Sequence, residues 1–355
     1  MEKISENILG LDKQSLAQTL KVHNLELFRT KQIWQWVYGK GARDFEVMTN
    51  ISKDIRSFLQ QNFVIYRPKV LNTQVSKDGT VKFLFALDNQ DTIETVYIPE
   101  DERGTVCLSS QVGCPLKCAF CHTGSQGFKR NLTVAEILGQ LMAVKDYLDD
   151  FRDLKLRRVT NVVMMGMGEP LLNYDNVRAA IRIIEDPDGL TVSKRKITLS
   201  TAGIAPMIKK CGEDLGVNLA LSLHAVTNEK RSQIMPINLK YPLEEVLQAC
   251  RDYPVSKNSR RITFEYIMLK DFNDTCEDAR TLVRLLKGIP AKINLIPFNA
   301  WPSCKYQPPT AKKIDEFADI LMKAGYASPI RTPRGQDILA ACGQLRSEME
   351  QLHGK

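Results

Sequence analysis

Apolar and polar positions follow three successive patterns along this chain, and each pattern predicts a different kind of element. Over residues 1–65, apolar residues recur every three or four positions, which is the spacing of one helix face. The segments 15–20, 29–37 and 51–63 are therefore expected to be helical. Residues 1–65 are predicted to form a small helical accessory domain that binds RNA, with Lys31, Lys40 and Arg43 as possible contacts.

Between residues 66 and 102 the pattern changes to short apolar runs that are bounded by turn-forming residues. One run covers 81–87 and follows Asp78-Gly79, and the other covers 93–98 and follows Asp88-Asn89. Runs of this length between turn signals are typical of strands. This segment is expected to be a β-hairpin bridge into the domain that follows.

From residue 103 to 345, short apolar runs alternate with segments of helical periodicity. Strands are expected near 106–109, 159–165, 196–200, 217–223, 261–268, 293–297 and 329–331. Helices are expected between them, for example over 133–147, 176–184 and 243–251. This alternation predicts an α/β fold of parallel strands with right-handed crossovers, closing fully or partly into a barrel. Residues 346–355 are a tail.

Composition excludes several classes of protein. Hydrophobic residues make up 43% of the chain and charged residues 25%, which is ordinary for a soluble globular protein. No apolar run is long enough to cross a bilayer, and the first residues lack the layout of a signal peptide. The nine cysteines are odd in number and unevenly spaced, unlike a disulfide framework. The protein is expected in the cytoplasm, without membrane contact.

The net charge of +8 favours a polyanionic partner. Short basic runs stand at 129–130, 155–158, 194–196, 209–210 and 260–261. Each run alone is typical of a solvated face or a helix end. Their recurrence within one domain makes a nucleic-acid partner an even possibility before any motif is considered.

Three cysteines carry the most specific motif of the chain. Cys114, Cys118 and Cys121 have the spacing C-x₃-C-x₂-C and follow the first barrel strand. Three thiolates on one loop can hold three irons of a [4Fe–4S] cube, whereas ferredoxins normally supply four cysteines. The open iron is a place for a substrate, because a vacant metal position is typical of catalysis, and the candidate is the amino and carboxylate group of S-adenosylmethionine. A zinc site that includes His122, or cysteines that only pack in the core, are the alternatives.

Glycines and small polar residues recur where the predicted strands end, and active sites of such barrels lie at the carboxyl ends of strands. Gly166-Met167-Gly168-Glu169 follows the second strand. Its glycines permit close approach of a ligand, and Glu169 offers a carboxylate to an ammonium group. The other strand-end candidates are Ser200, Ser222, Leu223, His224 and Asn299. Each alone is typical of a cap or turn, but their repetition favours a pocket.

Two further cysteines stand apart from the motif. Cys107 lies seven residues before Cys114, and Cys342 lies near the C-terminus between Ala340-Ala341 and Gly343. The small neighbours of Cys342 would leave its thiol accessible. Composition alone would place both residues in the core.

Together these motifs resemble the radical S-adenosylmethionine RNA methyltransferases. The runs that carry the resemblance are 109–121, 166–173, 221–225, 235–238 and 340–345, and it extends over essentially the whole chain. It implies a partial (β/α)₆ barrel of the TIM type. The family has one branch that methylates C2 of an adenine and one that methylates C8. Residues 169–173 and 331–335 are similar to the C2 branch.

The resemblance also implies a role for each candidate residue. Cys114, Cys118 and Cys121 would ligate the [4Fe–4S] cluster. Gly168, Glu169, Ser200, Ser222, Leu223, His224 and Asn299 would bind S-adenosylmethionine, of which two molecules are used per turnover. Cys342 would be methylated and would carry the methyl carbon to the adenine, Glu94 would accept the C2 proton, and Cys107 would resolve the protein–RNA adduct.

The implied substrates are 23S rRNA, at an adenine of the peptidyl-transferase centre, and tRNA, at the adenine beside the anticodon; the sequence itself leaves the tRNA undecided. An external electron donor of flavodoxin or ferredoxin type and a monomeric enzyme are also expected. The chain departs from the family pattern at Leu339 and Ala300. A C8 methyltransferase, a zinc-stabilised RNA-binding protein and a radical enzyme for another substrate are the competing interpretations.

Overall fold

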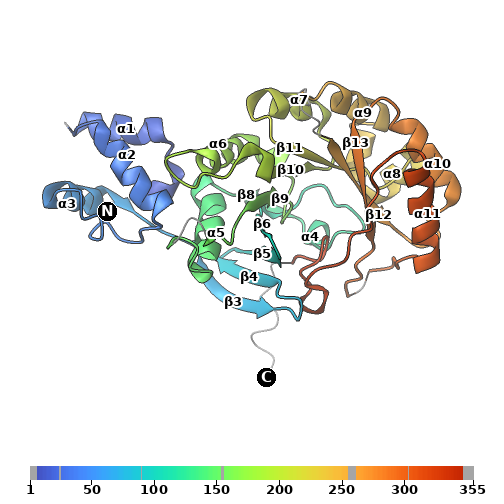
Figure 1. Ribbon diagram of the computed structural model, residues 1–355, viewed down its shortest axis with the longest axis horizontal. Coiled ribbons are helices and arrows are strands. Elements are labelled where there is room, and N and C mark those ends of the chain that lie inside the picture. Colours follow the sequence, from blue (N-terminus) through green and yellow to red (C-terminus); the bar gives the residue numbers. More distant parts are fainter. Residues whose placement is uncertain are drawn as a thin grey trace.

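The computed structural model describes residues 6–23, 25–88, 90–152, 156–254, 261–302 and 304–346 (Figure 1). Most of the expected tail, from residue 347 onward, lies outside the described residues. Lys155 and Arg260 of the basic runs and Asn89 of a turn also lie outside them. Within the described ranges, every helix is too short or too polar to span a bilayer.

Six parallel strands form the body of the molecule, and their order in the sheet follows their order in the chain. They are β6 (Arg103–Cys107), β9 (Asn161–Met164), β10 (Ile197–Thr201), β11 (Asn218–Ser222), β12 (Ile262–Met268) and β13 (Ala291–Pro297). The sheet does not close, because β13 is an edge and β6 pairs on its other side with an antiparallel strand. The expectation of a partial (β/α)₆ barrel is confirmed.

Helices connect these strands, and most of them lie along the outside of the sheet (Figure 1), whereas α8 (Asn228–Ile234) lies against the carboxyl ends of β10 and β11. They are α5 (Val134–Tyr147), α6 (Tyr174–Glu185), α7 (Ala205–Asp214), α8 (Asn228–Ile234), α9 (Leu243–Arg251), α10 (Cys276–Leu285) and α11 (Ala311–Lys323). Helix α5 begins at a capping box in which the Thr133 side chain and the Glu136 side chain each bond the other's backbone N–H. Its middle residues are buried on several faces, and it packs against α6 and the 3-10 turn at Ile8–Gly10.

Three antiparallel strands extend the barrel sheet beyond β6. They are β5 (Thr92–Glu100), β4 (Val81–Ala86) and β3 (Lys69–Val75). The sequence predicted a hairpin of two strands, and the structure adds β3 as a third. Strand β3 is mostly exposed at the sheet edge, so burial imposes no apolar pattern on it.

The prediction of a regular strand at 329–331 was wrong. The chain there joins β13 through isolated bridges at Ala327 and Ile330. Pro329 has no N–H to donate and contributes only its carbonyl, which accepts the Leu295 N–H at 3.0 Å.

The N-terminal helices pack beside α5 and α6 at one side of the barrel (Figure 1). They are α1 (Lys13–Val22), α2 (Phe28–Trp34), which continues as the π-helical turn η2 (Gln35–Gly39), and α3 (Lys53–Asn62). Lys13 pairs with Asp186 and Asp188, at 3.0 and 2.8 Å, in the loop after α6. The Trp34 indole N–H also bonds Asp186, at 3.1 Å. The helical unit is therefore joined to the barrel by buried and half-buried side chains.

Candidate active site inside the barrel

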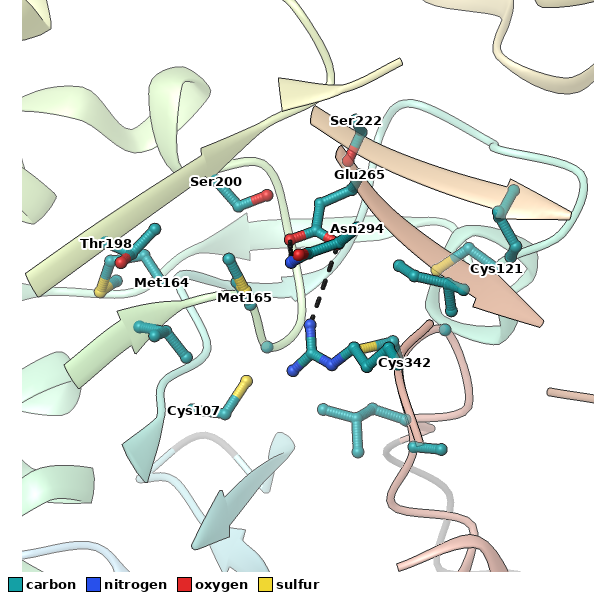
Figure 2. A pocket seen from close by; sticks show the side chains of 18 of the residues that line it. Cys107, Cys121, Met164, Met165, Thr198, Ser200, Ser222, Glu265, Asn294 and Cys342 are labelled. Carbon is teal, nitrogen blue, oxygen red and sulfur yellow. Dashed lines mark hydrogen bonds and ion pairs between the residues drawn. The ribbon is translucent and has the colours of Figure 1, made fainter. Parts of the chain in front are cut away.

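A cavity of about 590 Å³ lies inside the barrel and brings most of the candidate residues together (Figure 2). The candidates that line it are Cys107, Cys114, Cys118, Cys121, Gly168, Glu169, Ser200, Ser222, His224, Asn299 and Cys342. They come from loops and strand ends that are as far apart in sequence as 107 and 342. The parallel strands place these segments around one space, as a barrel of this type requires.

The three-cysteine loop is held by backbone contacts at both ends and in its middle. Strands β7 (Gln111–Gly113) and β8 (Phe128–Asn131) pair antiparallel and close the loop. The Cys114 N–H bonds Gly127 O at 2.8 Å, and the Ala119 N–H bonds Ile234 O at 2.9 Å. The short helix α4 (His122–Ser125) follows directly. These backbone contacts hold the loop in place together with the buried side chains of Leu116 and Phe120.

The cysteine side chains face an apolar surrounding that includes Phe120 and Ile234. Burial raises the pKa of the Cys114 thiol to about 12 and also raises that of Cys118. A thiolate is costly here unless a cation binds it, so this donor set fits an iron centre that displaces the protons. Among the described residues, no three His, Cys, Asp or Glu side chains converge on a single metal ion. A cube suits this spacing, because each thiolate binds a different iron.

The segment after β9 provides a close approach and a carboxylate. Gly168 has φ +98°, and a Cβ there would lie 2.5 Å from Gln111 Cβ, so only glycine fits. The two carboxylate oxygens of Glu169 accept backbone N–H groups, Oε1 from Leu171 at 3.1 Å and Oε2 from Ala202 at 2.8 Å. Burial raises the pKa of Glu169 to about 7. A ligand ammonium group would favour the ionised form and complete its coordination.

Asn299 supplies an unsatisfied acceptor to the same space. Its Oδ1 is buried and has no hydrogen-bond partner, while its Nδ2 donates to Cys342 O at 3.4 Å. A buried amide oxygen without a donor is uncommon in folded proteins, so it fits a ligand that brings a hydroxyl or amino group. This orphan atom supports the assignment of Asn299 to S-adenosylmethionine.

His224 has a different part in the site. Its Nδ1 accepts the Ile267 N–H at 3.0 Å, its ring packs edge-on against Phe120, and burial lowers its pKa to about 3. The ring is therefore neutral. It shapes the cavity wall beside the cysteine loop.

Two candidates, Leu223 and Glu94, are not among the described residues that line the cavity. The Leu223 side chain is fully buried, and its backbone bonds Glu265 O and the Arg231 side chain. Glu94 lies behind the loop that carries Cys342 and bonds the Arg346 N–H at 2.8 Å.

The two lone cysteines lie on the same cavity and are both free thiols (Figure 2). Burial, and secondarily the proximity of Cys342, raises the pKa of Cys107 to about 12. The Cys342 loop is fastened to α4 by the His122 N–H, which bonds Gly343 O at 2.7 Å. The Thr123 hydroxyl donates to Leu345 O, also at 2.7 Å. The loop with Cys342 therefore rests directly on the element that follows Cys121.

Sequence reasoning missed a polar group of the cavity wall that is formed by Glu265, Asn294 and Arg331. Glu265 Oε1 accepts a hydrogen bond from Asn294 at 3.0 Å, and Glu265 Oε2 lies 3.9 Å from the Arg331 guanidinium (Figure 2). Arg331 had served only as a marker of the C2 branch. A carboxylate within the apolar strand β12 was the available signal, since a buried charge needs a partner.

Comparison with known proteins agrees with this geometry. The model of the radical SAM superfamily matches residues 108–286, and that of the ribosomal RNA large subunit methyltransferase N-terminal domain matches residues 6–65. The dual-specificity RNA methyltransferase RlmN of Bradyrhizobium sp. strain BTAi1 is 52% identical over 98% of this chain and 90% of its own length. That of Gluconobacter oxydans is 54% identical over 97% of this chain and 86% of its own length.

The chain belongs to the RlmN family. A radical SAM methyltransferase from Sphaerobacter thermophilus, known from its crystal structure, has the same fold with a TM-score of 0.90 at 37% identity. It covers 97% of this chain, and all of its own length is matched. This RlmN-family enzyme is a radical SAM RNA methyltransferase whose cofactors are a [4Fe–4S] cluster and S-adenosylmethionine.

Proposed function

We propose that this enzyme methylates C2 of adenine 2503 in 23S rRNA and C2 of adenine 37 in tRNA. The observation that carries the proposal is the single cavity that contains the three-cysteine loop together with Cys107 and Cys342. A radical enzyme without a methyl-carrying thiol would need the three-cysteine loop but not Cys107 and Cys342. The names of the relatives support RNA as the substrate, and residues 169–173 and 331–335 support the C2 position.

Each group of residues has a proposed role in holding the cofactors. Cys114, Cys118 and Cys121 ligate the cluster. S-adenosylmethionine is bound by the cavity residues Gly168, Glu169, Ser200, Ser222, His224 and Asn299. Leu223, which does not line the cavity, supports this binding by holding the backbone between Ser222 and His224 in place. When bound, these cofactors would supply a methyl group for the Cys342 sulfur and the means to remove one hydrogen atom from that methyl group. The carbon radical left on Cys342 can add to the electron-poor C2 of adenine, where polar transfer is disfavoured.

The residues of the chain then complete the reaction in three steps. The Cys342 thiolate takes the methyl group by displacement at carbon, and after this methyl group has lost one hydrogen atom its carbon forms the bond to C2. Glu94, directly or through a water, would accept the C2 proton from the adduct, and the unpaired electron of the adduct would return to the cofactors, which restores the aromatic ring. The Cys107 thiolate attacks the Cys342 sulfur, and the bond between that sulfur and the RNA-bound carbon breaks. Its electron pair stays with the carbon, which takes up a proton, and a disulfide remains for thiol exchange to reduce.

The proposal extends to partners and setting. The enzyme acts as a monomer in the cytoplasm and receives electrons from an external donor of flavodoxin or ferredoxin type. Its target adenine must leave the base stack to enter the barrel. Recognition should therefore depend on RNA shape and phosphate contacts, and activity should weaken as the salt concentration rises.

Mass spectrometry of nucleosides tests the function directly. The enzyme is reconstituted anaerobically and supplied with a reductant, S-adenosylmethionine and unmodified 23S rRNA or tRNA. We expect 2-methyladenosine in both RNAs. Product with the methyl group at C8 would identify the other branch of the family. Product in rRNA alone would remove tRNA from the proposal, and absence of S-adenosylmethionine cleavage would contradict the radical mechanism.

A further inference from the structure

Among the described residues, Arg231 has the largest fully buried charged side chain. The proposed reaction steps give it no role. It lies on α8, and its side chain is 0% exposed. The guanidinium donates to Leu223 O at 3.1 Å, Ala202 O at 2.6 Å, Ser222 O at 3.1 Å and Asn238 Oδ1 at 2.9 Å. All four acceptors are uncharged.

Such an arrangement satisfies the hydrogen bonds of Arg231 but leaves its charge without a counter-ion. Among the residues that the structure describes, no carboxylate forms an ion pair with it. Other buried cations of this chain do have one. Lys145, for example, pairs with Asp150. A buried, unpaired guanidinium is costly, so a negative group that is acquired after folding would be strongly favoured beside it.

The three-cysteine loop is the neighbouring site that can supply this negative charge. Helix α8 ends at Ile234, whose carbonyl accepts the Ala119 N–H from within the loop. Ile234 and Met235 pack in one apolar group with Phe120 of the loop. Cys118 is the first of the groups whose negative charge would act on Arg231, and Arg231 acts in return on Cys118. Arg231 is fully buried, so its charge is screened less by solvent and salt than that of an exposed residue.

We propose that Arg231 is a positioning residue for electron transfer, whose positive charge balances the cluster and raises its reduction potential. A cube held by three thiolates is anionic, and reduction adds one more negative charge. Net charge is one of the properties that set the potential of such clusters. A fixed cation therefore favours the reduced form more than the oxidised form. The proposal rests on the assignment of the cluster to Cys114, Cys118 and Cys121, and does not depend on which adenine is methylated.

The test is the midpoint potential of the cluster in the full-length, anaerobically reconstituted enzyme, measured by redox titration with detection of the reduced cluster by electron paramagnetic resonance. In Arg231→Met we expect the equilibrium constant for one-electron reduction to fall about tenfold or more, which is about 59 mV. Arg231→Lys keeps the charge but not the fork of donors. Its potential should stay close to that of the parent enzyme, while its thermal stability falls.

Lys230→Met is the matched control. It removes the same charge from the adjacent position of α8, but Lys230 already pairs with Asp278 at 2.7 Å and is 33% exposed. Its potential should not change. If Arg231→Met does not retain a cluster, Asn238→Asp is the second test. It places a carboxylate against the Arg231 guanidinium, which neutralises the positive charge, so the midpoint potential of the cluster should fall as expected for Arg231→Met.

Two results would overturn the inference. One is a parental potential in Arg231→Met or, where that variant loses the cluster, in Asn238→Asp. The other is an equal shift in Arg231→Lys and Arg231→Met, which would make the hydrogen bonds responsible instead of the charge. Failure of the parent enzyme to hold any cluster would instead contradict the cofactor assignment, and iron analysis distinguishes these cases.

Discussion

Lys82 Nζ lies 3.0 Å from Glu94 Oε1, and both side chains are buried. Lys82 also reaches Leu339 O at 3.4 Å, while Glu94 Oε2 accepts the Arg346 N–H at 2.8 Å. The pair therefore contacts the Cys342 loop on both sides of the thiol. Burial raises the pKa of Glu94, and the Lys82 ammonium is the main influence that lowers it. The proposed proton acceptor thus depends on Lys82 for its charge.

Lys82→Met should slow removal of the C2 proton. Without Lys82 the pKa of Glu94 rises further, so less carboxylate is ionised at neutral pH, and the rate of product release should recover as pH increases. The other ionisable groups beside this pair, Arg346 and His122, stay in place. The fraction of RNA bound covalently to protein, followed on denaturing gels from neutral to alkaline pH, measures this effect.

Removing one partner of a buried ion pair should also reduce stability by about 3 kcal/mol. Lys129→Met is the control for the loss of a charge, since the Lys129 side chain is 71% exposed in its pair with Asp91. Adduct levels equal to those of the parent enzyme at every pH would show that Lys82 does not support Glu94.

Binding of S-adenosylmethionine should weaken in acid because of Glu169. Its pKa is raised to about 7 by burial, and only the ionised carboxylate attracts the amino group of the ligand. Below about pH 7 the affinity should therefore fall by up to about tenfold for each pH unit, because binding must release a proton. Equilibrium dialysis with the reconstituted enzyme measures this dependence. In Glu169→Gln the affinity should be low and the dependence on pH should disappear; a parental slope in that variant would assign the titration to another group.

The order of the barrel strands could be predicted from sequence, because buried parallel strands give apolar runs that helical segments separate. The exact ends of the helices and strands could not be predicted. Strand β3 could not be predicted either, because it is exposed at the sheet edge and so has no apolar pattern. The site was predictable where a motif carries the chemistry, as at Cys114 and Glu169.

Residues that act through a distant partner left no local signal. Lys82 is the one charged residue in an otherwise apolar strand, but its partner Leu339 lies in a loop more than 250 positions away, at 3.4 Å. Arg231 reads in the sequence as a charged residue on a short surface helix. In the structure Arg231 is buried, because α8 packs against the ends of β10 and β11 and its guanidinium bonds Ala202 O and Ser222 O. Such roles follow from tertiary contacts that spacing cannot reveal.

Arg331 should activate the Cys107 sulfur on the cavity wall. Its positive charge lowers the pKa of Cys107, and Cys342 is the strongest of the negative influences on Arg331 itself. Arg331→Gln should therefore raise the pKa of Cys107, and attack on the adduct at neutral pH should slow by about tenfold for every tenfold loss of thiolate. Arg331→Lys should restore most of the rate because it keeps the charge. Single-turnover release of methylated RNA is the measurement, and equal rates for the two variants would assign the effect to shape.

The two cysteines of the relay should fail at different stages. Cys107→Ala should form the adduct but not release it, so that product stays below one equivalent per enzyme and protein-linked RNA accumulates. Cys342→Ala should give neither adduct nor methylated RNA, because it lacks the sulfur that carries the carbon, although S-adenosylmethionine can still be cleaved reductively. Cys276→Ala, a half-buried cysteine at the start of α10, is the control and should turn over normally. Intact mass spectrometry after a single turnover separates the three outcomes. Multiple turnovers by Cys107→Ala, or methylated RNA from Cys342→Ala, would contradict the relay, because no other thiol of the described chain lines the cavity apart from the three assigned to the cluster.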